Sequence, residues 1–174
     1  MIIGSVSENK DLEKRISITP DLVKKYISLG FKVLIEQNYG EHLGFSNEDY
    51  KKEGCEIEEK KSVLEKSDII LQLNLPEESS LSLIKEKKLL IGVFNPYQNN
   101  EKLMSLSKKN INIFSLELLP RITRAQSMDI LSSQANLAGY KAVIDSFAIF
   151  QKAVPMMMTA AGTIPAARVL VVGA

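Results

Sequence analysis

The stretch Leu89-Leu90-Ile91-Gly92-Val93-Phe94 decides the fold class of this chain of 174 residues. It is apolar almost without interruption, so a strand formed here would be buried on both faces. Strands of this kind are typical of a parallel sheet that helices cover on each side. The same reasoning predicts further strands at Ile2–Val6, Phe31–Glu36, Asp68–Leu73 and Ile111–Phe114.

Helix signals lie between these runs. Thr19 is followed by Pro20 and Asp21, which is a typical helix start, and Gly30 is a typical helix end. We therefore predict a helix that reaches about Leu29. The other predicted helical segments are Asn47–Glu53, Ser62–Lys66, Pro76–Glu86 and Asn100–Lys109. Alternating strands and helices predict an α/β fold with a parallel, Rossmann- or flavodoxin-like sheet and right-handed crossovers.

The pattern changes after residue 124. Ala125–Lys152 contains no proline and a single glycine, and its apolar residues fall on several helix faces. This is typical of a helix buried between layers or domains, so we interpret it as a long connector that ends at or just before Pro155. We expect Met156–Thr163 to be a loop of small and gap-filling residues, and Arg168–Val172 to be a buried strand.

The predicted last strand runs into Gly173, as at the start of a dinucleotide-binding G-x-G-x-x-G turn. Only the first of these glycines is present, so this pattern alone is weak. A strand with nothing after it to cover its second face favours a chain that stops inside the loop. We therefore expect an N-terminal α/β domain at 1–124, a linking helix at 125–154, and the truncated start of a second, Rossmann domain at 155–174.

Composition argues against several classes of function. The net charge is +1, and the interspersed Lys and Glu residues predict no basic surface for nucleic acid. Cys55 and His42 are single residues of their types, so we expect no intramolecular disulfide and no metal site. No signal peptide is visible, and no apolar run reaches the roughly 20 residues of a membrane span. Any link to a membrane would come through a partner.

Polar residues are dense in Leu119–Gln134, although a very apolar helix begins there. The segment follows a predicted strand, so it would lie at the carboxyl edge of the sheet, where α/β proteins bind ligands. Gln126, Asp129 and Ser132 recur at every third position and form a slanted polar row on a helix. Arg121 comes just before them. Such side chains could hold a carboxamide and ribose hydroxyls.

A purely structural explanation of these residues stays open at this point. Thr123 with Gln126 fits a capping box, in which two side chains satisfy the first N–H groups of a helix. Arg121 with Asp129 could form an ion pair at a solvated helix start.

The stretch RITRAQSMD at Arg121–Asp129, followed by NLAGY at Asn136–Tyr140, resembles the NAD-binding alpha subunit of proton-translocating NAD(P) transhydrogenases. KRISITP at Lys14–Pro20 is similar to an opening that transhydrogenases share with alanine dehydrogenases. The end of the chain is similar to the same family's passage into its second domain; the matching segments are Pro155–Thr163, Pro165 and Arg168–Gly173. The resemblance spans the whole chain.

The resemblance implies an NAD(H)-binding component that passes hydride from NADH to NADP⁺, coupled to proton translocation. It implies a homodimer and a partner beta subunit, which binds NADP(H) and lies in the membrane. The location implied is cytoplasmic, peripheral to the inner membrane through that partner. Because most of the glycine loop is missing, we expect this chain alone to be inactive and to bind NAD(H) weakly at most.

By position, the resemblance places Arg121 and Gln126 beside the nicotinamide, with Asp129 and Ser132 completing the pocket. These four are the candidate catalytic residues, and all but Asp129 are also candidate cofactor contacts. The remaining cofactor-binding positions that the resemblance implies are Ile122, Thr123, Leu131 and Gly173.

Two alternatives stay open. The first is an alanine-dehydrogenase-like oxidoreductase, but the lysine and histidine of those enzymes match Asn74 and Val93 here. Arg15, which in the dehydrogenases holds the substrate carboxylate, is present, and we expect it to be structural. The second alternative is a non-catalytic module that dimerises through the apolar helix.

Overall fold

The structure is a computed structural model that describes residues 1–173. The chain divides into two compact units, Met1–Met128 and Asp129–Ala174, and each is described by itself.

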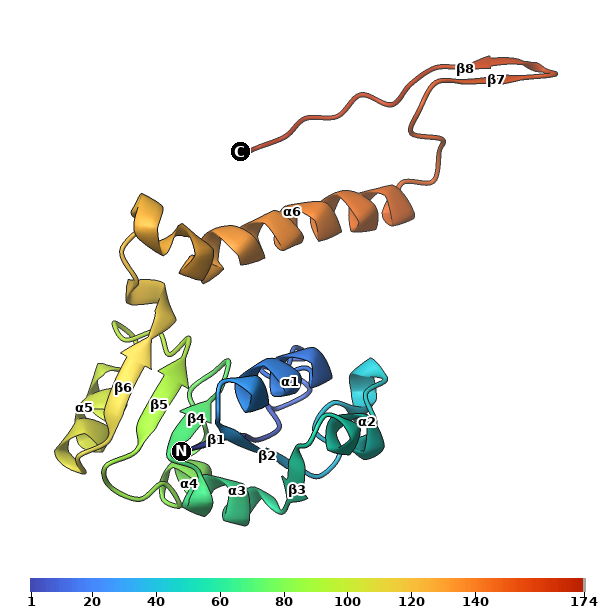
Figure 1. Cartoon of the computed structure of the whole chain (residues 1–174). Helices are drawn as coiled ribbons and strands as arrows, with labels where there is room; N and C mark the ends of the chain where they lie inside the picture. Colours follow the sequence, from blue (N-terminus) through green and yellow to red (C-terminus); the bar gives the residue numbers. More distant parts are fainter. Residues whose placement is uncertain (174) are drawn as a thin grey trace. The chain divides into compact units, whose positions relative to one another are not determined.

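The first unit is built on a six-stranded sheet in the order β3-β2-β1-β4-β5-β6, in which every neighbouring pair is parallel (Figure 1). The strands are β1 Ile2–Ser5, β2 Lys32–Glu36, β3 Glu56–Glu58, β4 Ile69–Leu71, β5 Leu89–Gly92 and β6 Asn112–Ser115. The predicted α/β fold with a parallel Rossmann-like sheet is confirmed. Five of the strands were expected, and β3 was not, because a Glu-Ile-Glu edge strand has no apolar run to mark it.

Short helices connect the strands. They are α1 Pro20–Ser28, α2 Asn47–Lys52, α3 Lys60–Lys66, α4 Glu78–Leu81 and α5 Asn100–Lys108, with 3-10 turns η1 Glu41–Leu43, η2 Leu116–Leu118 and η3 Thr123–Met128. The helix predicted over Pro76–Glu86 is limited to the single turn of α4. Serine is a weak helix former. The hydroxyl of Ser82 donates to the carbonyl of Ser79, and this side-chain hydrogen bond competes with the backbone hydrogen bonds of a longer helix.

Hydrophobic residues form a core on each face of this sheet. Leu34 of β2 points to one side, where residues of α3, α4 and α5 pack. Its neighbours Val33 and Ile35 point to the other side, where residues of α1 and α2 pack. In Figure 1, α1 lies above the strands while α3 and α4 lie below them. Both faces of the sheet are therefore covered, as the continuous apolar strands require.

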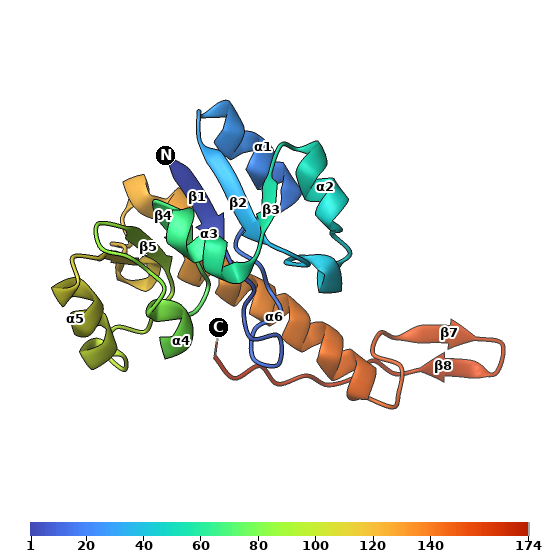
Figure 2. The same cartoon turned by 90° about the horizontal axis from the view of Figure 1, so that it is seen from below.

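The order of the strands creates a switch point between β1 and β4. From β1 the chain adds β2 and β3 on one side, and it then returns to add β4, β5 and β6 on the other. Figure 2 shows β1 and β4 next to each other from a second direction. In open parallel sheets, the carboxyl ends of the strands flanking such a point leave a crevice in which ligands bind.

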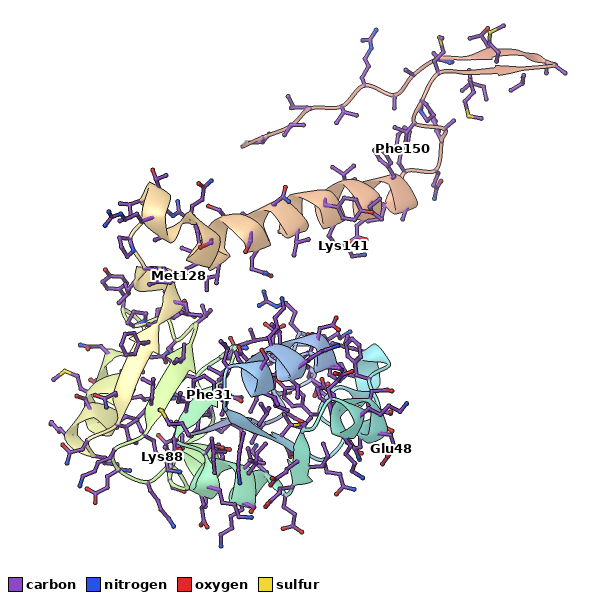
Figure 3. The ribbon with its side chains drawn as sticks, in the orientation of Figure 1. Phe31, Glu48, Lys88, Met128, Lys141 and Phe150 are labelled. Carbon is purple, nitrogen blue, oxygen red and sulfur yellow. The ribbon has the colours of Figure 1, made fainter. Side chains whose placement is uncertain are left out.

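Lys88 shows how the structure satisfies a buried helix end. Its ammonium group, labelled in Figure 3, donates to the carbonyls of Leu64, Glu65 and Ser67 at the end of α3. Burial lowers the pKa of Lys88. The lysine thus supplies the donors that the last turn of α3 would otherwise lack.

The second unit consists of the helix α6, Ile130–Ile149, and an antiparallel hairpin of β7, Met157–Thr159, and β8, Gly162–Ile164. All twenty residues of α6 keep exposed or partly exposed side chains, which project from every side of the helix in Figure 3. The helix is shorter than the predicted Ala125–Lys152, because η3 takes up the residues before it and Phe150 leaves the helical conformation.

Two other expectations for this region are wrong. The predicted loop Met156–Thr163 contains β7 and the start of β8, joined by the two residues Ala160 and Ala161. The predicted strand Arg168–Val172 is neither helix nor strand. A strand needs a neighbour to pair its N–H and C=O groups, and within residues 1–173 this segment has none.

Candidate functional site

The segment that carries the predicted nicotinamide contacts begins directly after the carboxyl end of β6. It first turns twice, through η2 and η3, and is fixed by the buried side chain of Ala125. The backbone N–H of Ala125 donates to the carbonyl of Ile122 at 2.9 Å. Around this anchor the side chains of Arg121, Thr123 and Gln126 are exposed. These three side chains are therefore accessible to a ligand or to another part of the protein.

Asp129 and Ser132 are brought together at the start of α6. Asp129 is the N-cap residue: one carboxylate oxygen accepts from the backbone N–H of Ser132 at 2.9 Å, and the other accepts from its hydroxyl at 2.6 Å. The alternative of a capping box formed by Thr123 and Gln126 does not account for the start of α6, since these residues lie in the 3-10 segment before the α-helix. Aspartate is among the best N-cap residues, which explains why the helix begins here.

The candidate residues divide between the two units. Arg121, Ile122, Thr123 and Gln126 belong to the first unit, whereas Asp129, Leu131, Ser132 and Gly173 belong to the second. Gly173 lies outside helices and strands and has a φ of 83°, a value that glycine tolerates and other residues rarely adopt. The pocket that these residues would form together stays a prediction.

A second candidate site lies within the first unit, and of its lining the sequence analysis named only Asn74 and Val93. A crevice of about 560 Å³ opens at the carboxyl ends of β1, β4 and β5, at the switch point of the sheet. Asn74 and Val93 line it. The switch-point rule could have located this crevice only after the strand order was known, because its walls come from residues far apart in the sequence.

Glu8 reaches across this crevice from the segment after β1. One oxygen of its carboxylate accepts from the backbone N–H of Leu73 at 2.7 Å and of Asn74 at 3.3 Å. The side-chain amide of Gln72 donates to the same oxygen at 3.1 Å. Burial raises the pKa of Glu8, and the hydrogen bonds from Leu73 and Asn74 work against that rise.

Gln72 is itself fixed from the other side. Its buried amide oxygen accepts from the backbone N–H of Val6 at 2.9 Å and from the hydroxyl of Ser5 at 3.1 Å. The ends of β1 and β4 are thus tied together through one side chain.

Arg15 is paired with Glu13 at the edge of the same crevice. The Nε and one terminal nitrogen of Arg15 donate to the two carboxylate oxygens of Glu13, at 2.8 and 2.6 Å. This two-point contact is the main cause of the lowered pKa of Glu13 and of the raised pKa of Arg15. The guanidinium is therefore already bound to a carboxylate of its own chain.

The segment that carries Arg15 is held by the hydroxyl groups of Tyr39 and Ser17. Tyr39 accepts from the backbone N–H of Ser17 at 2.9 Å and of Ile18 at 3.3 Å. The hydroxyl of Ser17 donates to the carbonyl of Leu71, at the end of β4. These contacts fix the approach to α1 above the carboxyl edge of the sheet.

The doubly wound parallel sheet, with its crevice at the switch point, defines a Rossmann-like α/β protein. A family model described as the alanine dehydrogenase/PNT N-terminal domain matches residues 4–138, so the chain belongs to that family. The predicted resemblance to this family is confirmed.

Individual relatives agree with the family. An NAD(P) transhydrogenase subunit alpha polypeptide of Rhodospirillum rubrum is 42% identical over 179 residues, covering 99% of this chain and 47% of the relative. The corresponding polypeptide of Rickettsia prowazekii is 39% identical, covering 99% and 46%. The crystal structure of transhydrogenase from Sinorhizobium meliloti has a TM-score of 0.91 at 40% identity, covering 96% of this chain and 50% of that one. The chain thus spans about half the length of these relatives.

Two further observations concern the described residues alone. No helix within 1–173 combines the length and the apolar character that crossing a membrane requires. The same residues form no cluster of three or more histidine, cysteine or acidic side chains suited to a metal ion.

Proposed function

We propose that this chain is the N-terminal portion of the NAD-binding component of a proton-translocating NAD(P) transhydrogenase. The observation that carries the proposal is the segment Arg121–Ser132. It presents exposed polar side chains after β6 and joins Asp129 to Ser132 by two hydrogen bonds at the start of α6. The transhydrogenase alpha subunits that match 99% of the chain support the same proposal.

The donors in this segment fit a nicotinamide nucleotide. Arg121 supplies planar N–H groups and Gln126 supplies both a donor and an acceptor, as recognition of a carboxamide and ribose hydroxyls requires. Ile122 and Leu131 offer apolar contact for a ring, and both residues are exposed. The bound nicotinamide supplies the hydride chemistry, so these residues need only bind and orient. Such positioning can be worth roughly 7–11 kcal/mol of barrier.

The remaining elements of the proposal concern the assembly. NADP(H) would be held by a partner beta subunit in the membrane, and this component would lie on the cytoplasmic side as a homodimer. The exposed apolar residues of α6 support a partner surface, because apolar patches of this kind seldom face water in isolated proteins. We further propose that 1–124 is an N-terminal domain, 125–154 a connector, and 155–174 the start of the NAD-binding domain, with Gly173 in its glycine loop.

Amino-acid oxidation is less well supported. Asn74 and Val93 line the crevice at the two positions where the resemblance to alanine dehydrogenases would require a lysine and a histidine. Val93 cannot carry a proton, and the two-point contact with Glu13 occupies Arg15.

NADH binding provides the test. In a chimera, this chain replaces the matching 47% of the Rhodospirillum rubrum relative, and isothermal titration measures its affinity for NADH. We expect the chimera to bind NADH, Arg121→Ala to weaken binding, and the 174-residue chain alone to bind weakly at most. Lys108→Ala, on the exposed end of α5, is the control variant and should bind as the parent does. Equal binding by the parent and by Arg121→Ala would contradict the assigned site.

A further inference from the structure

The carboxyl ends of β5 and β6 are joined by side chains as well as by the backbone. The two strands, which are neighbours in Figure 1, pair as far as Gly92 and Ser115. Beyond this pair, side-chain oxygens replace backbone carbonyls as acceptors. The hydroxyl of Ser115 accepts from the backbone N–H of Phe94 at 3.3 Å. The carboxylate of Glu117 accepts from the backbone N–H of Asn95. The link between the strands is thus prolonged by the segment that leads to the candidate nicotinamide residues.

Glu117 is bound at both oxygens of its half-buried side chain. One oxygen accepts from the Asn95 N–H, and the other accepts from the Ser115 hydroxyl at 2.8 Å. The loop on the Asn95 side is also bonded internally, because the Asn95 carbonyl accepts from the N–H groups of Gln98 and Asn99 at 2.9 and 3.0 Å. Hydrogen bonds to a carboxylate are stronger than those between neutral groups. Glu117 therefore anchors the start of η2 to the loop after β5.

The position of Arg121 depends on this anchor. Its side chain makes no hydrogen bond or ion pair with another of residues 1–173, so the backbone alone positions the guanidinium. Arg121 follows Glu117 closely in the sequence, and the turn between them is closed by the N–H of Leu119, which donates to the carbonyl of Leu116 at 3.2 Å. Each residue of such a turn has only two soft backbone dihedrals. Release of Glu117 therefore displaces Arg121.

We propose that Glu117 is a positioning residue of the nicotinamide site: its carboxylate fixes the direction in which the chain leaves β6 and thereby places the Arg121 guanidinium. This role rests on the proposed function, because Glu117 acts through the residue that would bind the nicotinamide. The property that matters is the length of the side chain more than its charge. An amide of the same length still accepts from Asn95, whereas a shorter carboxylate does not reach both of its partners.

Isothermal titration of the Rhodospirillum rubrum chimera with NADH tests this role. Glu117→Ala should weaken NADH binding by about tenfold, the effect of one hydrogen bond to a charged group. Glu117→Gln keeps the length of the side chain and should bind within about twofold of the parent. Glu117→Asp keeps the charge but is shorter, so it should bind as weakly as Glu117→Ala. Glu86→Ala removes an exposed acid from the turn before β5; it is the control and should bind as the parent does.

A double variant separates positioning from a general loss of stability. Arg121→Ala alone should weaken NADH binding by about tenfold. If Glu117 acts through Arg121, the double variant Glu117→Ala/Arg121→Ala should bind within about twofold of Arg121→Ala. A loss of stability would weaken binding whether or not Arg121 is present, and the two effects would then multiply to about 100-fold.

Failure of this role can be told apart from failure of the proposed function. A parent chimera that does not bind NADH, or Arg121→Ala binding as tightly as the parent, contradicts the proposed function and the role of Glu117 with it. If the parent binds and Arg121→Ala binds more weakly, multiplied losses in the double variant overturn the role of Glu117 alone. Binding like that of the parent by a folded Glu117→Ala or Glu117→Asp variant does the same. If Glu117→Ala does not fold, Glu117→Asp replaces it in the double variant.

Discussion

The carboxylate of Asp129 accepts two hydrogen bonds from Ser132, one from its backbone N–H at 2.9 Å and one from its hydroxyl at 2.6 Å. The two residues that, by the resemblance, complete the nicotinamide pocket thus also form the cap of α6. Structure and proposed binding depend on the same side chains, and substitutions can separate the two roles.

Asp129→Ala should destabilise α6 by about 0.5–2 kcal/mol, because it removes the N-cap acceptor. Asp129→Asn keeps an oxygen acceptor and should retain most of that stability. Urea unfolding of the chain, followed by circular dichroism, measures both. If Asp129→Ala were as stable as the parent, the cap would contribute nothing.

Gly92→Ala should destabilise the first unit by about 1–3 kcal/mol through overpacking. A Cβ at this position would lie 2.2 Å from the backbone oxygen of Gln72 and 2.5 Å from the ring of Phe94. Gly139→Ala is the control, since a Cβ there meets no described atom within 4 Å. Because glycine weakens a helix interior by roughly 0.5–1 kcal/mol, this variant should be more stable than the parent. Thermal unfolding measures both variants: the melting temperature should fall for Gly92→Ala and rise for Gly139→Ala, relative to the parent.

Glu13 should make the stability of the chain depend on pH. Its contact with Arg15 holds its pKa below the ordinary value of 4.5, so the folded state binds this proton less readily than the unfolded state does. The contribution is present above pH 4.5 and is lost as the pH falls through the lowered pKa. Glu13→Gln should therefore lose less stability on acidification than the parent. Urea unfolding at several pH values measures the stability of both proteins. If the parent and Glu13→Gln lost the same stability as the pH fell, the contact between Glu13 and Arg15 would not be the cause.

Much of the first unit could be predicted because most of its strands are continuous apolar runs that can be recognised in the sequence. Leu89–Gly92 is apolar on both faces, and a helix start is visible at Thr19–Asp21. By contrast, β3 at Glu56–Glu58 lies at the edge of the sheet and alternates charge with a single apolar residue. The helix start at Asp129 was misplaced because a 3-10 segment directly precedes α6, as is common at the ends of α-helices.

Other features depend on contacts that no local pattern records. The hairpin of β7 and β8 turns through Ala160 and Ala161, which lack the Asn-Gly or Asp-Gly signal of a two-residue loop. The hydrogen bond between Glu8 and Leu73 joins residues 65 positions apart, and it exists only because β1 and β4 are neighbours. The candidate nicotinamide residues were found through a family resemblance, because polar residues at a helix start fit a cap equally well.

Hydride transfer by the chimera is the most direct test of the proposed function. The chimera of this chain with the rest of the Rhodospirillum rubrum relative is combined with that organism's partner subunits, and reduction of an NADP⁺ analogue by NADH is followed. Transfer should occur, and Arg121→Ala should lower the rate on the order of 10²-fold, as misplacement of a reacting group by about 1 Å does. A chimera that folds and binds its partners but transfers no hydride, or an Arg121→Ala variant with an unchanged rate, would contradict the proposal.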